Sequence, residues 1–569
     1  MHVLSAGALV ILLLVLGLVF HSGFCLTLNC FEALKVGVPI RVLPINHNNP
    51  IWMLLDRPVL AFVRRLPFGL GDNSFTRYNF RAWEIHDRYR SHHEMGDVWM
   101  HVTPVRNWLY VGDPETVTEI WKRGRDFPRE TTATAMLDVF GENIATSQGE
   151  QWRRHRRLVN KSFNDQNNRI VWSESINVAS DVLQYWTSEK SVKTIADDTR
   201  TLALHVMSRA GFGRSFKFQG RGKDDGNASD GPTMNYKDSL KMILENCVLI
   251  FVFGPKFLGK TWLPRKLRTL HKACVSFQQH MTEAYEEEKR VLGAGQSQPA
   301  DQNFLTLLVR ASQGDDQQNG SNGYLTESEI YGNMFTFNFA GHDTTAHTFT
   351  FALYFLAAFP EVQNWIHEEI RHVAGARCTQ ETEYEIDFPR LKRCLAVMLE
   401  TLRIYTPVPT SKFTGSSAQT LKVGRGGKTI VVPPMTMVLP SYAALQTDPK
   451  WWGTDSLQWR PSRWIEEQNS GAVRSGPGDE ELITPRPGSY LAWSGGARDC
   501  PGRKFSQVEF VATLATLFRE HRVEPVPMAG ETPETSRKRV LHLIETDSAP
   551  VLLLQMLHPE RAPLRWRRR

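Results

Sequence analysis

The stretch "LAWSGGARDCPGRKF" (residues 491–505) places one cysteine, Cys500, among glycines and arginines. Its first part has the composition of a turn, and its last part has helical character. A thiol in this setting is a metal ligand, a nucleophile or a small apolar residue at the start of a helix. The stretch alone leaves these three interpretations open, and the rest of the sequence has to separate them.

The cysteine content of the 569-residue chain argues against a disulfide framework. Its seven cysteines are scattered, and they form no CxxC pair and no Cys/His cluster with the spacing of zinc ligands. This usage favours a reducing compartment and disfavours a zinc site.

The net charge of +7 is concentrated in two segments, "WRRHRRLVNK" (152–161) and "RAPLRWRRR" (561–569). No nucleic-acid-binding module accompanies these charges, so we expect no nucleic-acid partner. A solvated face or a docking surface for an acidic partner is the better interpretation.

The N-terminal segment "VLSAGALVILLLVLGLVF" (residues 3–20) carries no charge. As a helix it would span about 27 Å, close to the thickness of the hydrocarbon core of a bilayer. No lysine or arginine precedes it and no clear cleavage site follows, which favours a transmembrane signal-anchor over a cleaved signal peptide. The first basic residues, Lys35 and Arg41, follow the segment, so the rest of the chain should be cytosolic. The sequons at Asn160, Asn227 and Asn319 should then carry no glycan.

Most of the remaining chain has helical apolar spacing, with fewer β-like runs such as "KTIVVPP" (428–434). The longest helical pattern starts at Thr326, which forms a capping box with Glu329, and runs to about Ala358. Its interior contains "NFAGHDTTAHT" (338–348), which is rich in poor helix formers. This weakness indicates either a functional site or a bend in which threonine hydroxyls bond to backbone carbonyls.

Two further motifs are weak when each is taken alone. Glu400 and Arg403 of "ETLR" share a helix face, and Trp152 and Arg156 lie one helical turn apart. The same spacings recur elsewhere in the chain as ordinary surface pairs. The order of the motifs is more informative, because "ETLR" is followed by "WRPSRW" (459–464) and then by the Cys500 stretch.

Taken in order, Trp152/Arg156, "AGHDTT", "ETLR", "WRPSRW" and "WSGGARDCPG" resemble the cytochrome P-450 family of haem-thiolate monooxygenases. The resemblance implies a mainly α fold with a smaller β-rich part, preceded by one N-terminal transmembrane helix. The expected organisation is an anchor over 3–20, a connector over 21–59 and a haem-thiolate domain over 60–569. The anchor and the texture of the loops resemble a microsomal, fungal-type member.

The resemblance also implies a role for the opening stretch. Cys500 occupies the position of the axial thiolate ligand of the iron in haem b, and Gly496, Arg498 and Gly502 match the surrounding pattern. The chain departs from the pattern at Trp493, where the family usually has phenylalanine.

Other site residues are implied by the same resemblance. Asp343 and Thr344 match the family's acid–alcohol pair, in which the hydroxyl bonds to dioxygen and the acid delivers protons through water. The implied propionate-binding residues are Trp152, Arg156 and Arg498, and the implied structural ion-pair triad is Glu400, Arg403 and Arg463.

The implied activity is insertion of one oxygen atom from O2 into a lipophilic small molecule, in fungal secondary metabolism. The electrons would come from a separate NADPH–cytochrome P-450 reductase, with cytochrome b5 as a further partner, at the endoplasmic reticulum membrane. Basic residues on the thiolate side would dock the acidic flavoprotein; they are Arg153, Arg154, Arg157, Arg503 and Lys504. Two alternatives remain, namely a haem-thiolate isomerase or dehydratase that uses no O2, and a non-catalytic haem-binding protein.

The substrate itself is not specified by the sequence. The segments expected to line its pocket are 131–144, 335–341 and 405–413, which are apolar with interspersed hydroxyls and Lys412. This composition is typical of a site for a lipophilic molecule with a few oxygen atoms.

Overall fold

The computed structural model describes residues 2–47, 49–130, 134–220, 234–294, 303–313, 324–375, 377, 381–424, 427–467 and 476–569. The chain divides into two compact units. Unit 1 comprises Met1–Glu130, Arg403–Trp459 and Thr484–Cys500, and unit 2 comprises Thr131–Leu402, Arg460–Ile483 and Pro501–Arg569.

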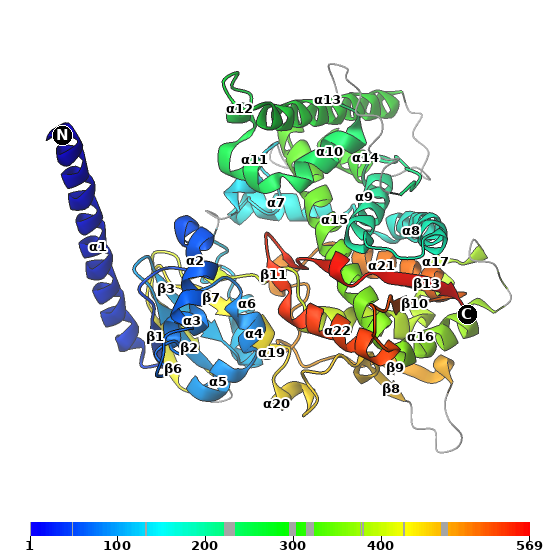
Figure 1. The fold of residues 1–569 in the computed structure, drawn as a ribbon. Helices are drawn as coiled ribbons and strands as arrows, with labels where there is room; N and C mark the ends of the chain where they lie inside the picture. Colours follow the sequence, from blue (N-terminus) through cyan, green and yellow to red (C-terminus); the bar gives the residue numbers. More distant parts are fainter. Residues whose placement is uncertain are drawn as a thin grey trace. The chain divides into compact units, whose positions relative to one another are not determined.

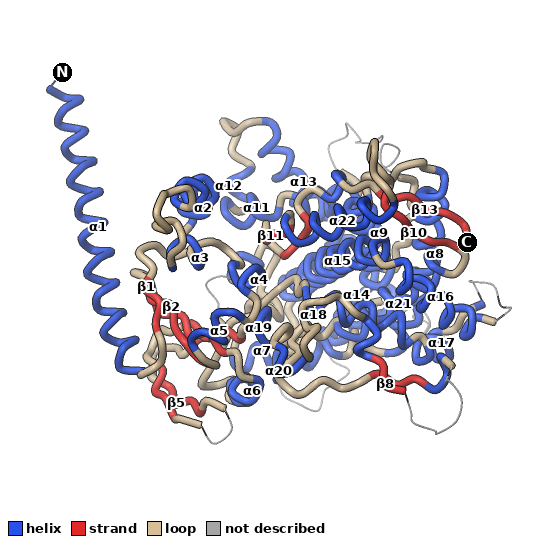
Figure 2. The backbone as a smooth tube through the Cα atoms, turned by 60° about the horizontal axis from the view of Figure 1, so that its bottom comes forward, coloured by secondary structure: helices blue, strands red, loops and turns tan. Residues whose placement is uncertain are grey.

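Unit 1 contains a mixed five-stranded sheet in the order β1-β2-β3-β7-β4. Its strands are β1 (Ile40–Val42), β2 (Val98–Val102), β3 (Asn107–Val111), β7 (Met437–Pro440) and β4 (Lys412–Phe413). Figure 2 shows β1 and β2 side by side, and these two strands pair in parallel. A separate hairpin is formed by β5 (Gln419–Lys422) and β6 (Thr429–Val432), which confirms the strand predicted at "KTIVVPP".

Short helices surround this sheet. They are α2 (Pro50–Val63), α3 (Ser74–Tyr78), α4 (Trp83–Asp87), α5 (Arg90–Met95), α6 (Pro114–Lys122), α19 (Tyr442–Leu445) and α20 (Pro449–Trp452). The core of this unit is made by apolar side chains of the sheet and of α6, among them Met100, Leu109 and Ile120, all of which are fully buried.

The N-terminal helix α1 (His2–Val36) is longer than the predicted anchor. By length and composition, residues Leu12–Val36 could cross a membrane, with a mean hydropathy of 1.9. The helix continues through the first part of the predicted connector because that part contains no proline before Pro39. Its last turns belong to unit 1, where Ala33 and Val36 are buried in the core.

Unit 2 is mostly helical (Figure 1). Its helices are α7 (Gly149–Asn160), α8 (Asp165–Ser188), α9 (Ile195–Phe212), α10 (Tyr236–Glu245), α11 (Cys247–Phe253), α12 (Pro255–Leu258), α13 (Arg265–Gly293), α14 (Phe304–Gln313), α15 (Glu327–Ala358), α16 (Pro360–Ala374), α17 (Tyr384–Asp387), α18 (Lys392–Ile404, the last two residues in unit 1), α21 (Arg503–Phe518) and α22 (Pro533–Thr546). Three antiparallel strand pairs complete it: β8 (Ile465–Glu467) with β9 (Glu480–Leu482), β10 (His521–Pro525) with β13 (Leu564–Arg568), and β11 (Ser548–Pro550) with β12 (Leu554–Met556).

Helix α15 is the central element of unit 2 and contacts α9, α14, α21 and α22 (Figure 1). The predicted capping box is confirmed: the Glu329 N–H donates to Thr326 Oγ1 (3.2 Å), and the Thr326 N–H donates to Glu329 Oε2 (2.8 Å). The helix ends at Ala358, just before Pro360, as the sequence predicted. It runs through the poor helix formers of residues 338–348 without a break.

Helices α9 and α15 pack antiparallel along these residues. Thr199 and Thr350 meet through their hydroxyls (3.0 Å), and Met207 lies against Gly341 two turns further along each helix. A Cβ on Gly341 would lie 2.1 Å from Met207 Cε. Gly341, one of the poor helix formers noted in the sequence, therefore leaves room for the Met207 side chain of α9.

Candidate active site

The Cys500 loop is folded tightly and leaves its cysteine accessible. The Cys500 N–H donates to the carbonyl of Trp493 (2.9 Å), while Ser494 and Gly496 take φ angles of 61° and 70°. A Cβ on Gly495 would lie 2.4 Å from the ring of Trp121, so glycine permits this close contact with α6.

Exposure separates Cys500 from the other cysteines of the body that the structure describes; Cys378 lies outside the described residues. Cys500 is exposed, whereas Cys247, Cys274 and Cys394 are buried. Burial raises the pKa of all three buried thiols, to about 11 for Cys247 and about 12 for Cys274. Reactive or ligating thiols must lose their proton, so Cys500 is the suitable member of this set.

Three cations gather in unit 1, where the sequence predicted only Arg498. Burial lowers the pKa of Lys412 to about 8, with a further contribution from the charges of Arg498 and Arg129. Burial and Arg129 likewise lower the pKa of Arg498 to about 10, and burial lowers that of Arg129. Such a cluster is suited to a ligand with two carboxylates, as haem has in its propionates.

Helix α7 carries Trp152 and Arg156, both of them partly buried. The neighbouring His155 is buried and contacts Asn333 Nδ2 (3.0 Å), which fastens α7 to the first turns of α15. Arg154 forms an ion pair with Glu329 and donates to the carbonyl of Tyr324 (2.8 Å). The structure therefore gives Arg154 an internal partner, although the sequence placed it on the docking surface.

One side of α15 is accessible in the middle of an otherwise buried helix. Ala340 is exposed, and Thr344 follows one turn later on the same side. The Thr344 hydroxyl donates to the carbonyl of Ala340 (2.7 Å), which is the back-bonded arrangement considered for this segment. Asp343 lies beside Thr344 and has its closest ion-pair partner on α9, at Arg200.

Glu400 is completely buried, and its carboxylate accepts hydrogen bonds from one backbone N–H and two side chains. The donors are the Arg460 N–H (2.8 Å), Arg463 Nε (2.8 Å) and Trp464 Nε1 (2.9 Å). The predicted pair of Glu400 with Arg463 is thus present in unit 2.

The third member of the predicted triad, Arg403, has a role in unit 1. Its guanidinium donates to the carbonyls of Gln446 and Ser456 (2.6 Å each) and lies 5.1 Å from the centre of the Trp452 ring. These contacts hold the irregular segment between α19 and residue 459 in place.

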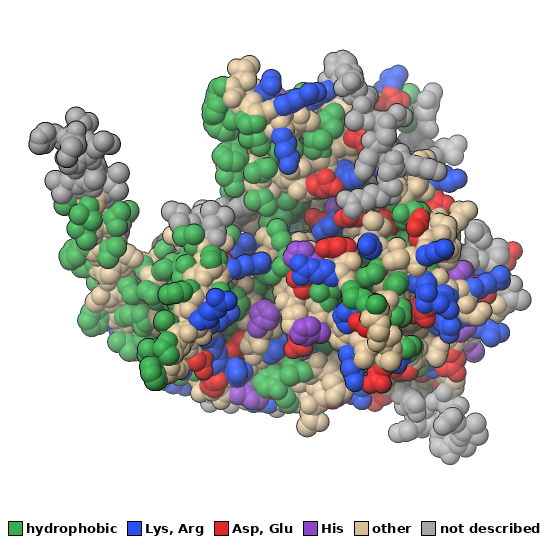
Figure 3. Space-filling view, in the orientation of Figure 1, with side chains coloured by type: hydrophobic (Ala, Val, Ile, Leu, Met, Phe, Trp, Pro, Cys, Tyr) green, Lys and Arg blue, Asp and Glu red, His purple; other side chains and the backbone are tan. Residues whose placement is uncertain are grey.

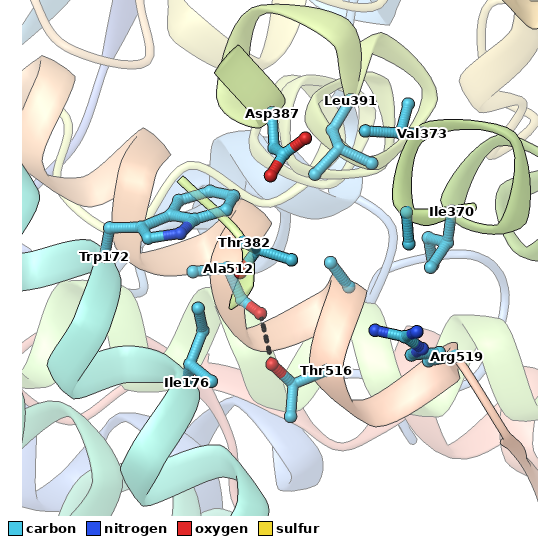
Figure 4. A pocket seen from close by; sticks show the side chains of 12 residues that line it. Trp172, Ile176, Ile370, Val373, Thr382, Asp387, Leu391, Ala512, Thr516 and Arg519 are labelled. Carbon is cyan, nitrogen blue, oxygen red and sulfur yellow. Dashed lines mark hydrogen bonds between the residues drawn. The ribbon is translucent and has the colours of Figure 1, made fainter. Parts of the chain in front are cut away.

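Unit 2 also contains a pocket that none of these residues lines (Figure 4). It is lined by Trp172 and Ile176 of α8, Ile370 of α16, Thr516 of α21 and Arg519, which follows α21, among others. None of the predicted site residues lines this pocket. The Thr516 hydroxyl in its wall donates a hydrogen bond to the carbonyl of Ala512 (2.9 Å).

The family model "Cytochrome P450" matches residues 77–549. This chain belongs to the cytochrome P-450 family. A cytochrome P-450 monooxygenase of Arthrobotrys oligospora is 28% identical and aligns over 89% of each chain. The "phomenoic acid biosynthesis cluster cytochrome P-450 monooxygenase" of Leptosphaeria maculans is also 28% identical, over 89% of this chain and 90% of its own.

Solved cytochrome P-450 structures share the fold. The crystal structure of one cytochrome P-450 heme domain superposes with a TM-score of 0.61 at 19% identity and covers 86% of this chain and 93% of its own. The comparisons confirm the predicted mainly α fold with small sheets. They also show that the protein is a monooxygenase of the haem-thiolate class, whose haem iron is ligated by a cysteine.

Sequence reasoning missed Arg129 and Arg200 and placed Lys412 only in the substrate pocket. No spacing rule connects residues 129, 412 and 498, because β4 and the loops bring them together only in the folded chain. Arg200 lies in a helix with no motif of its own, and its contact with Asp343 follows from the crossing of α9 and α15.

Proposed function

We propose that this cytochrome P-450 is anchored in the endoplasmic reticulum membrane and inserts one oxygen atom from O2 into a lipophilic small molecule. The accessible thiol of Cys500, on a loop closed by hydrogen bonding to Trp493, is the observation that supports it as the haem ligand. One relative is named for a biosynthetic cluster in a fungus, which supports a role in fungal secondary metabolism.

The residues of the chain fit the cofactor, and different residues would hold its iron and its propionates. When bound, the haem supplies the redox-active iron at which O2 is reduced, with a thiolate ligand that favours O–O cleavage. Cys500 would hold the iron, with Gly496 and Gly502 keeping the loop close. Arg498, Trp152 and Arg156 would bind the propionates, and we add Arg129 and Lys412 because their charges gather around Arg498.

Proton transfer would use Asp343 and Thr344. The Thr344 Oγ1 proton is held by the Ala340 carbonyl and can turn toward the accessible side of α15. Asp343 would pass a proton from solvent through a water molecule to this hydroxyl, which would hand on its own proton toward the accessible side of α15, and Asp343 would return to its ionised form.

The electron donors we propose are NADPH–cytochrome P-450 reductase and cytochrome b5. Exposed arginines of unit 2 support an acidic docking partner, namely Arg153 and Arg157 of α7 and Arg503 of α21.

The ligand assignment is tested by the spectrum of the reduced protein with CO. We expect the red-shifted Soret band of a thiolate ligand in the wild type and its loss in Cys500→His, whereas Cys25→Ser should keep it. A band like that of a histidine-ligated globin in the wild type would refute the assignment.

The chemistry is tested with Thr344→Ala. If Thr344 supplies the hydroxyl, product formed per NADPH should fall at least several-fold and hydrogen peroxide should rise, while Thr350→Ala, which removes another back-bonded hydroxyl of α15, should leave the ratio unchanged. Turnover without consumption of NADPH and O2 would favour the isomerase or dehydratase.

A further inference from the structure

The carboxylate of Asp343 lies in a polar site on the α9 side of α15. Its Oδ1 atom is 3.4 Å from Arg200 Nε and 3.5 Å from His342 Nδ1, and its side chain is only 15% exposed. His342 Nδ1 is buried and makes no hydrogen bond to any of the described residues. Both contacts are longer than a direct hydrogen bond, which leaves the carboxylate able to accept from water.

Arg200 is fixed from the opposite side by β12. Its Nη2 donates to Gln555 Oε1 (2.8 Å), and its Nη1 lies 3.5 Å from Asp197 Oδ1. The side chains of Arg200 and Asp197 are 31% and 50% exposed. Arg200 therefore connects the buried Asp343 to a solvent-exposed edge of unit 2. This edge, the α9–β12 rim, is formed by Arg200 and Asp197 of α9 beside Gln555 of β12.

The charges around Asp343 identify Arg200 as the important cation. Burial raises the pKa of Asp343, but His342, His347 and Arg200 outweigh it and hold the pKa below its usual value. The two histidines are themselves neutral near pH 7, because burial lowers the pKa of both, to about 3 for His347. At neutral pH the lasting positive charge comes from Arg200.

The remaining titratable groups that face Asp343 do not replace this charge. Asp197 of α9 lies at the exposed rim, 3.5 Å from Arg200 Nη1, and a carboxyl group cannot supply a positive charge. Cys247 of α11 is buried, and burial together with the charge of Asp343 raises its pKa to about 11, so this thiol is neutral.

We propose that Arg200 is a positioning residue for proton delivery: with Gln555 orienting it, Arg200 keeps Asp343 ionised and turned toward the α9–β12 rim, through which protons enter from solvent. This inference rests on the proposed role of Asp343. A proton from solvent at the rim binds an Asp343 oxygen and moves on through water to the Thr344 hydroxyl, which gives up its own proton on the accessible side of α15, and Asp343 returns to the carboxylate. Arg200 keeps all its protons throughout, because a guanidinium does not release one at neutral pH.

The test compares the pH profile of product formed per NADPH in matched variants. Arg200→Gln removes the charge, so the pKa of Asp343 should rise and the acidic limb of the profile should move to higher pH by about one unit. Arg200→Lys should restore most of the shift. Gln555→Leu keeps the charge of Arg200 but removes the hydrogen bond that orients it. This variant should therefore move the acidic limb of the pH profile to higher pH, but by less than Arg200→Gln. Arg209→Gln is the control, because Arg209 lies on the same helix and its guanidinium donates to the Gly213 carbonyl (2.7 Å).

The spectrum of the reduced protein with CO separates this proposal from the proposed function. A wild type without the thiolate band refutes the function itself. Variants that keep the band but have the wild-type pH profile overturn the role of Arg200. If Arg200→Gln does not fold, the Gln555→Leu variant provides the test. A pH profile whose acidic limb matches the wild type in Gln555→Leu also overturns the proposal.

Discussion

At the scale of single residues, Glu400 shows how one buried charge organises a segment. Its two oxygens accept from the backbone at Arg460 and from the side chains of Arg463 and Trp464. Glu400 and Arg463 are almost fully buried, with side-chain exposures of 0% and 5%. Removing one partner of such a pair leaves the other buried and uncompensated, which is far costlier than losing a surface pair.

Glu400→Gln should therefore lower the free energy of unfolding by about 3 kcal/mol. The measurement is the urea midpoint at which the haem spectrum is lost. The matched control is Glu368→Gln, because Glu368 also pairs with an arginine, Arg393 (2.6 Å), but is 64% exposed. That variant should lose less than about 1 kcal/mol. Equal midpoints for the two variants would contradict a structural role of the buried pair.

The sequence predicted the residues that lie within short motifs, and it did so from their order along the chain. Cys500 and Glu400 were identified in this way, although "ETLR" taken alone resembles any surface pair. Arg129, Arg200 and Gln555 could not be found, since each depends on elements that meet only in the folded chain.

At the scale of elements, α15 depends on glycines for different reasons. A Cβ on Gly332 would lie 2.2 Å from the carbonyl oxygen of Gly141, a backbone atom that cannot turn aside. A Cβ on Gly341 would meet only the end of the Met207 side chain, which can change rotamer. The sequence predicted the start and end of this helix correctly, because caps and prolines are local signals, but it could not distinguish the two glycines.

We expect Gly332→Ala to destabilise the protein by about 1–3 kcal/mol through the backbone clash. Gly341→Ala should be nearly neutral, because alanine favours the helix by about 1 kcal/mol and this gain offsets the displacement of Met207. Thermal or urea unfolding of the two variants checks this order of stability. A larger loss for Gly341→Ala would mean that Met207 cannot move, and Met207→Ala should then rescue that variant.

At the scale of the whole molecule, two features bear on the membrane. Helix α1 presents exposed apolar side chains over Leu12–Phe20. In unit 2, apolar side chains gather over α11 and α12 (Figure 3), and Val252, Phe253 and Trp262 are exposed there. The sequence identified the first feature by its long continuous apolar run but not the second, because the apolar run of α11 is only seven residues long and polar residues follow it.

Deletion of residues 1–25 should release most of the protein from membranes and keep the haem spectrum, because Asn29, Ala33 and Val36 remain packed in unit 1. Residual binding should disappear when Trp262 and Phe253 are also changed to serine. Sedimentation with vesicles of phosphatidylcholine measures both effects. Deletion of residues 1–36 should instead lose haem, since it removes core residues.

Glycan mapping of the full-length protein tests the proposed orientation. Asn160 lies exposed at the end of α7, while Asn227 and Asn319 lie outside the described residues. A glycan on any of the three would place the body on the lumenal side and contradict a cytosolic catalytic domain.

The cationic cluster of Arg129, Lys412 and Arg498 has a consequence for how the protein is made. The three neighbouring positive groups repel one another in a setting that water screens weakly, and a ligand that brings negative charge reduces this repulsion. Binding of haem as a counter-ion should therefore stabilise the folded chain at this point and protect it from proteases. The amount of enzyme a cell accumulates should accordingly follow its supply of haem as well as its supply of messenger RNA.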